Sequence, residues 1–115
     1  MQRDALFLQE IVDAAARIVE LTAGATIDHL NTDRDRRESL LWSFTVLGEA
    51  CTQLSRDMKE AHPEVPWRAP SDLRNRIVHG YWQLSPDILL ATGQDDMPAF
   101  LDAVRRVQRE MGGEP

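Results

Sequence analysis

Cysteine is nearly absent from this sequence, in which Cys51 is the single example. One cysteine excludes an intrachain disulfide and a multi-cysteine zinc site, and its place in an apolar periodic run predicts a buried, reduced thiol. No apolar run approaches the ~20 residues that span a bilayer, and residues 1–20 show no signal-peptide cleavage pattern. We therefore expect a soluble, cytoplasmic protein with no membrane partner.

Strand patterns and nucleotide-binding loops are also missing. No stretch alternates apolar and polar residues convincingly, no repeat or low-complexity tract occurs, and no glycine-rich loop follows a strand. His29 lies in a connector and His62 at a helix end, and neither has the spacing of a metal ligand. We expect neither a metal site nor a cofactor.

Positive charge is scarce overall but concentrated in one segment. The chain has 13 Lys and Arg against 19 Asp and Glu, a balance that excludes broad, nonspecific binding to polyanions. Within residues 67–82, however, three arginines stand against one acidic residue, beside a histidine and three aromatic rings on which bases can stack. These residues are Trp67, Arg68, Asp72, Arg74, Arg76, His79, Tyr81 and Trp82. Any contact with nucleic acid is expected here.

Apolar residues recur at helical spacing along nearly the whole chain. The periodicity predicts a helix over residues 2–22, a connector over 24–33, a long helix over 33–61, a short helix over 71–79 and a final helical segment over 86–111. Long helices joined by short links pack antiparallel. We expect an all-α, antiparallel bundle of four to five helices, with one domain over residues 1–111 and a frayed tail over 112–115.

Capping residues and helix breakers set the expected boundaries. Ser, Thr and Asn side chains accept hydrogen bonds from the first N–H groups of a helix, and proline fits its first position. Glycine ends helices readily, and an internal proline interrupts or bends them. The boundaries assigned in this way are N-caps at Asn31 or Thr32, Ser71 and Ser85, stops at Gly24 and Gly80, and a break or kink between Gly93 and Pro98.

The long predicted helix has two further features. Its apolar ladder from Leu40 to Met58 alternates steps of four and three residues, which is a helix-packing seam with apolar surface left over for a second copy. Gly48 lies inside this helix, where glycine costs ~1 kcal/mol relative to alanine. Close approach of another backbone would compensate for that cost, and an accident of sequence is the alternative.

Arg74 and His79 are the strongest candidates for chemistry. On a continuous helix they would be ~7.5 Å apart along the axis and about 140° apart around it, which suits two groups flanking one phosphodiester or pairing across a dimer axis. Histidine moves protons near neutral pH, and arginine offers a fork of donors to phosphate oxygens. RNA cleavage without a metal needs both capabilities. The spacing alone is a weak pattern, because residues so spaced usually cap a helix C-terminus, pair with Asp or Glu, or face solvent.

Several segments resemble, in order and spacing, the motifs of the HepT-like branch of the HEPN superfamily. Residues 48–50 read G-E-A, residues 63–67 read P-E-V-P-W, and residues 73–81 resemble the family pattern M-R-N-x-x-x-H-x-Y, which contains its R-x4-H-x-Y signature. The resemblance covers residues 4–108. Pro70 replaces a usual aliphatic residue and Asp72 a usual glycine, so Asp72 could orient the guanidinium of Arg74 or weaken its hold on phosphate.

The resemblance implies a homodimeric, metal-independent endoribonuclease that acts as the toxin of a toxin–antitoxin system. It implies that Arg74 and His79 are the catalytic pair, that Asn75 and Glu49 are supporting polar groups, and that RNA binds in one cleft lined by both copies. It also implies that an MntA-type nucleotidyltransferase antitoxin silences the toxin by adding AMP to Tyr81. The alternative is a non-catalytic dimeric HEPN module that binds a nucleotidyltransferase or nucleic acid. A purely structural adaptor would leave Trp67 and the arginines without a role.

Overall fold

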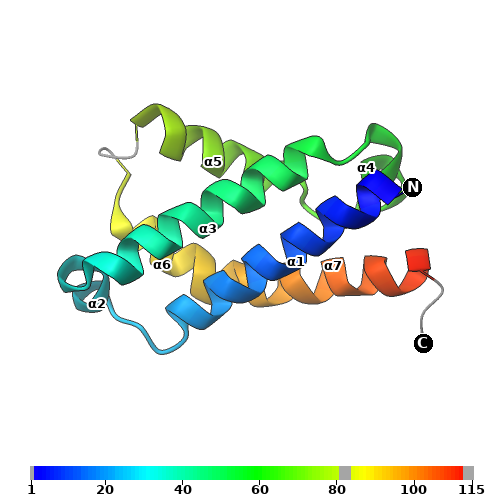
Figure 1. The fold of residues 1–115 in the computed structure, drawn as a ribbon. Helices are drawn as coiled ribbons and strands as arrows, with labels where there is room; N and C mark the ends of the chain where they lie inside the picture. The colour runs from blue at the N-terminus through cyan, green and yellow to red at the C-terminus, as the bar shows by residue number, and fades with distance from the viewer. Residues whose placement is uncertain (1, 81–83, 113–115) are drawn as a thin grey trace.

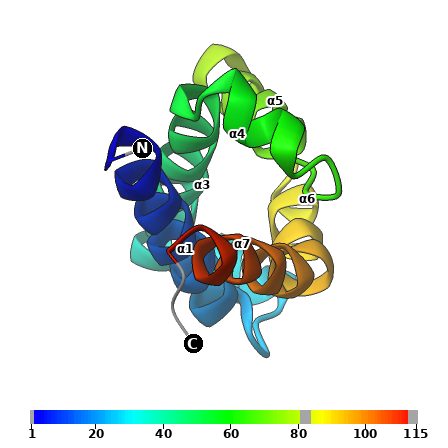
Figure 2. The same ribbon diagram turned by 90° about the vertical axis from the view of Figure 1, so that its right-hand side faces the viewer.

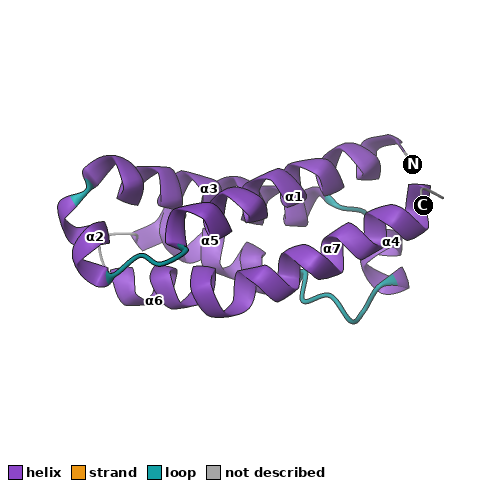
Figure 3. Cartoon of the chain, turned by 90° about the horizontal axis from the view of Figure 1, so that it is seen from below, coloured by secondary structure: helices purple, strands orange, loops and turns teal. Residues whose placement is uncertain are grey.

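The computed structural model describes residues 2–80 and 84–112, and the elements in these ranges are helical. The long helices are α1 (Gln2–Thr22), α3 (Arg34–Gln53), α5 (Arg68–Gly80) and α7 (Met97–Gly112). The shorter elements are α2 (Ile27–Thr32), α4 (Arg56–Ala61), α6 (Pro86–Ala91) and the π-helical turn η2 (Thr92–Asp96). Figure 3 shows these helices joined by short loops, which confirms the predicted all-α bundle.

Successive long helices run antiparallel to one another. In Figure 1, α1 and α3 lie side by side with opposite directions, and α5 returns along α3. The α6–η2–α7 run forms the last long element, and α7 packs against α1. Packing therefore leads from α5 through α3 and α1 to α7, and Figure 2 shows these helices arranged around the core, whereas α5 makes little direct contact with the α6–η2–α7 run.

One apolar core holds the bundle together. Its fully buried large side chains include Leu8, Ile11, Ile18, Leu30, Leu40, Phe44, Leu47, Cys51, Val104 and Val107. The seam from Leu40 to Leu54 is thus buried within one copy, so any apolar surface for a second copy lies outside these residues. The large apolar side chains exposed among the described residues are Leu6, Trp42 and Val78. None of the described helices combines the length and apolarity needed to cross a membrane.

Two predicted boundaries are confirmed by the backbone. Gly24 follows α1 with φ of +68°, the left-handed conformation that glycine adopts without a steric penalty. Ser85 is the N-cap of α6, since its hydroxyl accepts a hydrogen bond from the Asp87 N–H at 3.2 Å. Pro86 occupies the first helical position, where its missing N–H costs nothing.

The connector predicted over residues 24–33 contains an additional helix, α2. Thr26 caps it, because its hydroxyl accepts from the His29 N–H at 3.3 Å while its own N–H donates to His29 Nδ1 at 3.1 Å. This reciprocal capping box uses histidine in place of the usual glutamate or glutamine. The N-cap of α3 is Asp33, which accepts from the Arg36 N–H at 3.1 Å, so the assignment to Asn31 or Thr32 is wrong.

The helix predicted over residues 33–61 is divided in two at Leu54 and Ser55, where the backbone is extended. Ser55 caps α4 by accepting from the Met58 N–H at 3.1 Å. Asp4 in turn accepts from the Ser55 N–H at 2.9 Å and hydroxyl at 2.7 Å. Burial alone would raise the pKa of Asp4, but these hydrogen bonds outweigh burial, and the pKa is lowered. The division follows from a contact with α1 that local periodicity does not reveal.

Helix α5 begins and ends differently from its prediction. It starts at Arg68, so Pro70 lies in the first turn, where its missing N–H breaks no helical bond. Ser71 is not the N-cap, because its hydroxyl donates to the Gly48 carbonyl at 3.3 Å. Gly80 is the last helical residue, and among the described glycines only Gly24 has a positive φ.

The break expected between Gly93 and Pro98 is a change of helix type. The chain stays helical through η2, in which the Met97 N–H bonds to the Thr92 carbonyl five residues earlier. The extra residue of a π turn re-aims the side chains that follow it. Helical structure continues through α7 to Gly112, and the predicted frayed tail lies otherwise outside the described residues.

Candidate functional site

Gly48 lets α5 lie directly on α3. A Cβ at this position would be 2.2 Å from the Cβ of Arg74 and 2.6 Å from the backbone oxygen of Pro70, distances that real side chains do not adopt. The interpretation of Gly48 as a site of close backbone approach is therefore confirmed. As a result, the Cβ and Cγ atoms of the Arg74 side chain lie against α3 at Gly48.

The guanidinium of Arg74 is held by both predicted supporting residues, Glu49 and Asn75. Its Nη2 lies 3.1 Å from Glu49 Oε1, and its Nη1 donates to Asn75 Oδ1 at 2.9 Å. The third nitrogen, Nε, is buried and has no hydrogen-bond partner among the described residues. Asp72 does not orient this guanidinium, contrary to one of the two effects expected of it, because its carboxylate lies 3.9 Å from the exposed Arg68.

The polar contacts continue from Glu49 across α3 to α1. Gln53 Nε2 donates to Glu49 Oε2 at 3.1 Å, and Arg3 Nη2 donates to Gln53 Oε1 at 2.8 Å. Sequence reasoning missed both residues. The four-residue spacing of Glu49 and Gln53 on one helix could have indicated Gln53. Arg3 has no local signal, because it is 50 residues from Gln53 along the chain.

His79 lies apart from this polar cluster. It is exposed in the last turn of α5, and within residues 2–80 and 84–112 its ring forms no ion pair or hydrogen bond. On a regular helix its direction differs from that of Arg74 by about 140°. The structure therefore brings Arg74, Glu49 and Asn75 together and leaves His79 on the solvent side of the same helix.

Of the three aromatic residues expected to stack on bases, the structure describes only Trp67, which is not available for stacking. Trp67 is buried, its ring meets Phe100 edge-on at 6.4 Å, and its N–H donates to the His62 carbonyl at 3.0 Å. It cannot stack on a base, so this expectation is wrong. Tyr81, the predicted modification site, and Trp82 lie outside the described residues.

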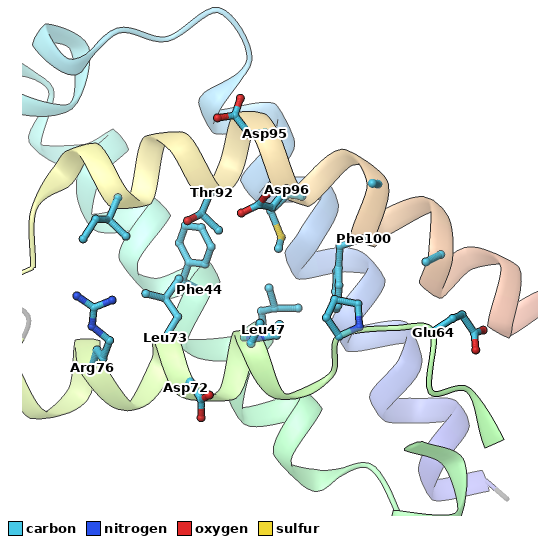
Figure 4. A pocket seen from close by; sticks show the side chains of 17 residues that line it. Phe44, Leu47, Glu64, Asp72, Leu73, Arg76, Thr92, Asp95, Asp96 and Phe100 are labelled. Carbon is cyan, nitrogen blue, oxygen red and sulfur yellow. The ribbon is translucent and has the colours of Figure 1, made fainter. Parts of the chain in front are cut away.

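The three arginines of residues 67–82 do not form one basic patch. Arg74 lies against α3, Arg68 is close to Asp72, and Arg76 projects from the opposite flank of α5 toward α6 (Figure 4). Only Arg74 belongs to the polar cluster that includes Glu49. A phosphate site on this helix would therefore use Arg74 locally and would not draw on a broad positive field.

Neither a reactive cysteine nor a metal-binding cluster offers an alternative to the Arg74 site within the described residues. Burial raises the pKa of the Cys51 thiol to about 12, which keeps it protonated and confirms its assignment as a buried thiol. Across residues 2–80 and 84–112, no three His, Cys, Asp or Glu side chains gather as they would to hold a metal ion.

The family model and the relatives that match this chain all have ribonuclease descriptions. The family model described as "Ribonuclease HepT-like" matches residues 11–107. "Probable ribonuclease HepT" of Thermococcus cleftensis is 24% identical over 103 residues, covering 90% of this chain and 94% of that protein. "Putative RNase MJ0127" of Methanocaldococcus jannaschii is 25% identical over 108 residues, covering 94% and 89%. No solved structure matches the chain significantly.

Proposed function

The chain belongs to the HepT-like ribonuclease family, and on that premise we propose that it is a metal-independent endoribonuclease in which Arg74 and His79 cleave RNA. The names of its relatives support ribonuclease activity in general. The observation that carries the assignment of the site is the guanidinium of Arg74, fixed by Glu49 and Asn75 on the helix whose last turn exposes His79.

Arg74 is proposed to bind the scissile phosphate. Its contacts with Glu49 and Asn75 fix the plane of the guanidinium before RNA arrives, so little rotamer entropy remains to be lost on binding. A buried donor without a partner costs roughly 1–3 kcal/mol, and Arg74 Nε is in this state. A phosphate oxygen that accepted a hydrogen bond from Nε would relieve that cost while the guanidinium stabilises charge on the phosphate.

His79 is proposed to move the proton. It removes the proton of the 2′-hydroxyl as that oxygen attacks phosphorus, so a 2′-oxygen–phosphorus bond forms and the bond to the 5′-oxygen breaks. The departing 5′-oxygen then takes a proton from an imidazolium. The products are a cyclic phosphate and a free 5′-hydroxyl, and the need for a 2′-hydroxyl makes the reaction specific to RNA.

A homodimer is proposed because one copy holds Arg74 and His79 apart. Trp42 and Val78 have exposed fractions of 68% and 48%. Trp42 precedes Glu49 by two helical turns and Val78 follows Arg74 by one, so both lie on the face that carries the ion pair. A second copy seated on this face would bury both side chains. It would also bring one copy's arginine toward the other's histidine.

The biological role proposed is that of a toxin controlled by adenylylation. Tyr81 lies two residues after His79 in the sequence. An MntA-type nucleotidyltransferase would transfer AMP from ATP to the phenol oxygen and release pyrophosphate. The added phosphate would place negative charge near Arg74 and His79, where it opposes binding of the RNA backbone. This role rests on family membership and on the position of the tyrosine.

A non-catalytic binding module is the second candidate, and one observation favours it. Arg74 is already paired with Glu49 and Asn75, as a structural arginine would be. In that case the helix would hold a nucleotidyltransferase or nucleic acid without cutting it.

Incubation of the purified protein with RNA in EDTA separates the two candidates. We expect cleavage by the natural chain and a loss of about 10²–10⁴-fold in His79→Ala and Arg74→Ala. Arg68→Ala is the matched control, because Arg68 is exposed on the same helix outside the polar cluster, and it should cut normally. RNA binding without cleavage, unchanged in His79→Ala, would establish the binding module instead.

A further inference from the structure

Both carboxylate oxygens of Glu49 are in contact with other side chains, and only one of them meets Arg74. Oε1 lies 3.1 Å from Nη2 of Arg74, whereas Oε2 accepts a hydrogen bond from Nε2 of Gln53 at 3.1 Å. The side chains of Arg74 and Glu49 are 30% and 47% exposed, and an ion pair this open to solvent is held loosely unless other contacts restrict its long side chains. The hydrogen bond from Gln53 therefore contributes to fixing the carboxylate and, through it, the guanidinium.

The amide of Gln53 has a defined orientation. A carboxylate only accepts hydrogen bonds, and a guanidinium only donates them. The NH₂ group of Gln53 therefore faces Glu49, and its carbonyl oxygen faces Arg3, whose Nη2 donates to Oε1 at 2.8 Å. If the amide turned over, its oxygen would lie against the Glu49 carboxylate and its NH₂ group against the guanidinium of Arg3. Arg3 thus determines which end of the amide Glu49 meets.

Two contacts of α1 keep Arg3 in place. The next residue, Asp4, accepts hydrogen bonds from the N–H and hydroxyl of Ser55, which hold the first turn of α1 beside the end of α3 (Figure 1). The guanidinium of Arg3 also lies 5.4 Å from the centre of the Phe7 ring, a cation–π contact one helical turn along α1. Arg3 is exposed, yet its neighbour in the sequence and the ring of Phe7 both restrict its position.

We propose that Gln53 is a positioning residue of the ribonuclease site and that Arg3 sets the orientation of its amide. This inference rests on the proposed function, in which Arg74 binds the scissile phosphate. Gln53 acts by holding the carboxylate of Glu49 where that carboxylate fixes the guanidinium of Arg74. The first turn of α1 thereby contributes to a site whose other polar groups belong to α3 and α5.

A purely structural role is the alternative, because the amide of Gln53 also joins α3 to α1. Two substitutions separate the roles. Gln53→Met keeps the length and the helix propensity of the side chain but removes both hydrogen bonds. Gln53→Glu keeps an acceptor for Arg3 but places a second carboxylate against Glu49, which like charge disfavours. It therefore preserves the link between the helices and removes the contact that positions Glu49.

Single-turnover cleavage at saturating RNA measures the effect on the chemical step. We expect Gln53→Met and Gln53→Glu each to lower the rate about 10-fold, because the guanidinium of Arg74 is misplaced without being removed. Neither substitution should lower the rate further in a Glu49→Gln background, since Gln53 acts through Glu49. Circular dichroism and urea unfolding check that each variant is folded under the conditions of the assay.

Gln108 provides the matched control. It is half-buried like Gln53 and also joins two long helices, since its Nε2 donates to Oε1 of Gln9 at 3.1 Å. It lies in α7, outside the polar cluster of Arg74. Gln108→Met and Gln108→Glu should leave the rate of cleavage unchanged.

Nitrogen-15 NMR of the Arg74 guanidinium tests the positioning in the absence of RNA. A guanidinium held by a carboxylate rotates slowly about its Cζ–Nε bond and gives separate signals for its two Nη groups, whereas faster rotation averages them. The signals are assigned by their loss in Arg74→Ala. We expect separate signals in the natural chain and in Gln108→Glu, and averaged signals in Gln53→Glu.

The two measurements distinguish failure of this inference from failure of the proposed function. If the natural chain cuts RNA and Gln53→Glu cuts it equally well, the positioning role is overturned and the proposed function stands. Equal losses in the Gln53 and Gln108 variants would overturn it as well. A natural chain that does not cut RNA would refute the proposed function, and Gln53 would then no longer be assigned to a ribonuclease site. Unchanged NMR signals in Gln53→Glu would show, with or without cleavage, that Gln53 does not position Arg74.

Discussion

Gly48 and Arg74 are in such close contact that a methyl group on Gly48 would lie 2.2 Å from the Cβ of Arg74. This contact sets the height of α5 above α3. It also determines where the guanidinium of Arg74 meets Glu49. The glycine in the middle of α3 is thus a positioning element for the candidate site as well as a packing residue.

Gly48→Ala is expected to destabilise the protein although alanine favours helix by ~1 kcal/mol. The added methyl must push α5 away, because one of its neighbours is the backbone oxygen of Pro70, and overpacking of this kind costs roughly 1–3 kcal/mol. Urea unfolding measures the change. Gly112→Ala, at the exposed end of α7, is the matched control. A Gly48→Ala protein as stable as the natural chain would contradict the close approach.

Glu49→Gln is expected to lower the rate of RNA cleavage by roughly 10- to 100-fold, because it loosens the guanidinium of Arg74 without removing it. Single-turnover cleavage at saturating RNA measures the effect on the chemical step. Since Glu49 acts through Arg74, Glu49→Gln should have little further effect in an Arg74→Ala background. Fully additive losses in the double variant would show that Glu49 acts elsewhere.

The contact between Asp4 and Ser55 predicts a specific dependence of stability on pH. The pKa of Asp4 is lowered in the folded protein, so its contribution is fully present above the unfolded value of ~3.9 and is lost as pH falls through the lower, folded value. Asp4→Asn should therefore reduce the free energy of unfolding at pH 7, and the difference from the natural chain should shrink below about pH 4. Urea titrations at several pH values measure it. A constant difference down to pH 2 would contradict the ionised contact.

Val78→Asp is expected to dissociate the proposed homodimer, because it buries a charge in the face that carries Trp42. Light scattering at micromolar concentration should give the mass of a dimer for the natural chain and of a monomer for Val78→Asp. Ala91→Asp, exposed on α6, is the control and should remain dimeric. A natural chain that is monomeric in this measurement would contradict the dimer.

The sequence predicted the parts of the fold that depend on local chemistry. Helical periodicity located the long helices, and the stop at Gly24 and the cap at Ser85 follow from single residues and their neighbours. Prediction from the sequence failed where a contact with a residue distant along the chain determines the local structure. The division of the long helix at Ser55 depends on Asp4, and the π turn depends on contacts between Gln94 and the end of α1. Spacing along the chain carries no trace of either contact.

Prediction of the candidate site was likewise correct for some residues and wrong for others. Motif spacing identified Arg74, Glu49 and Asn75, which the structure brings together. Trp67 was misassigned because its neighbours in the sequence are charged, whereas in the fold it faces Phe100. The separation of Arg74 from His79 within one copy was expected from helical geometry, and it is the reason for proposing that the histidine of one copy serves the arginine of the other.

A mixed dimer tests most directly the central claim that Arg74 and His79 act on one phosphodiester across two copies. Arg74→Ala and His79→Ala chains with different affinity tags are co-expressed, and the mixed dimer is purified through both tags. If arginine and histidine pair between copies, one of two equivalent sites is intact, and the mixed dimer should cut RNA at roughly half the natural rate. A mixed dimer as inactive as either variant alone would contradict the account.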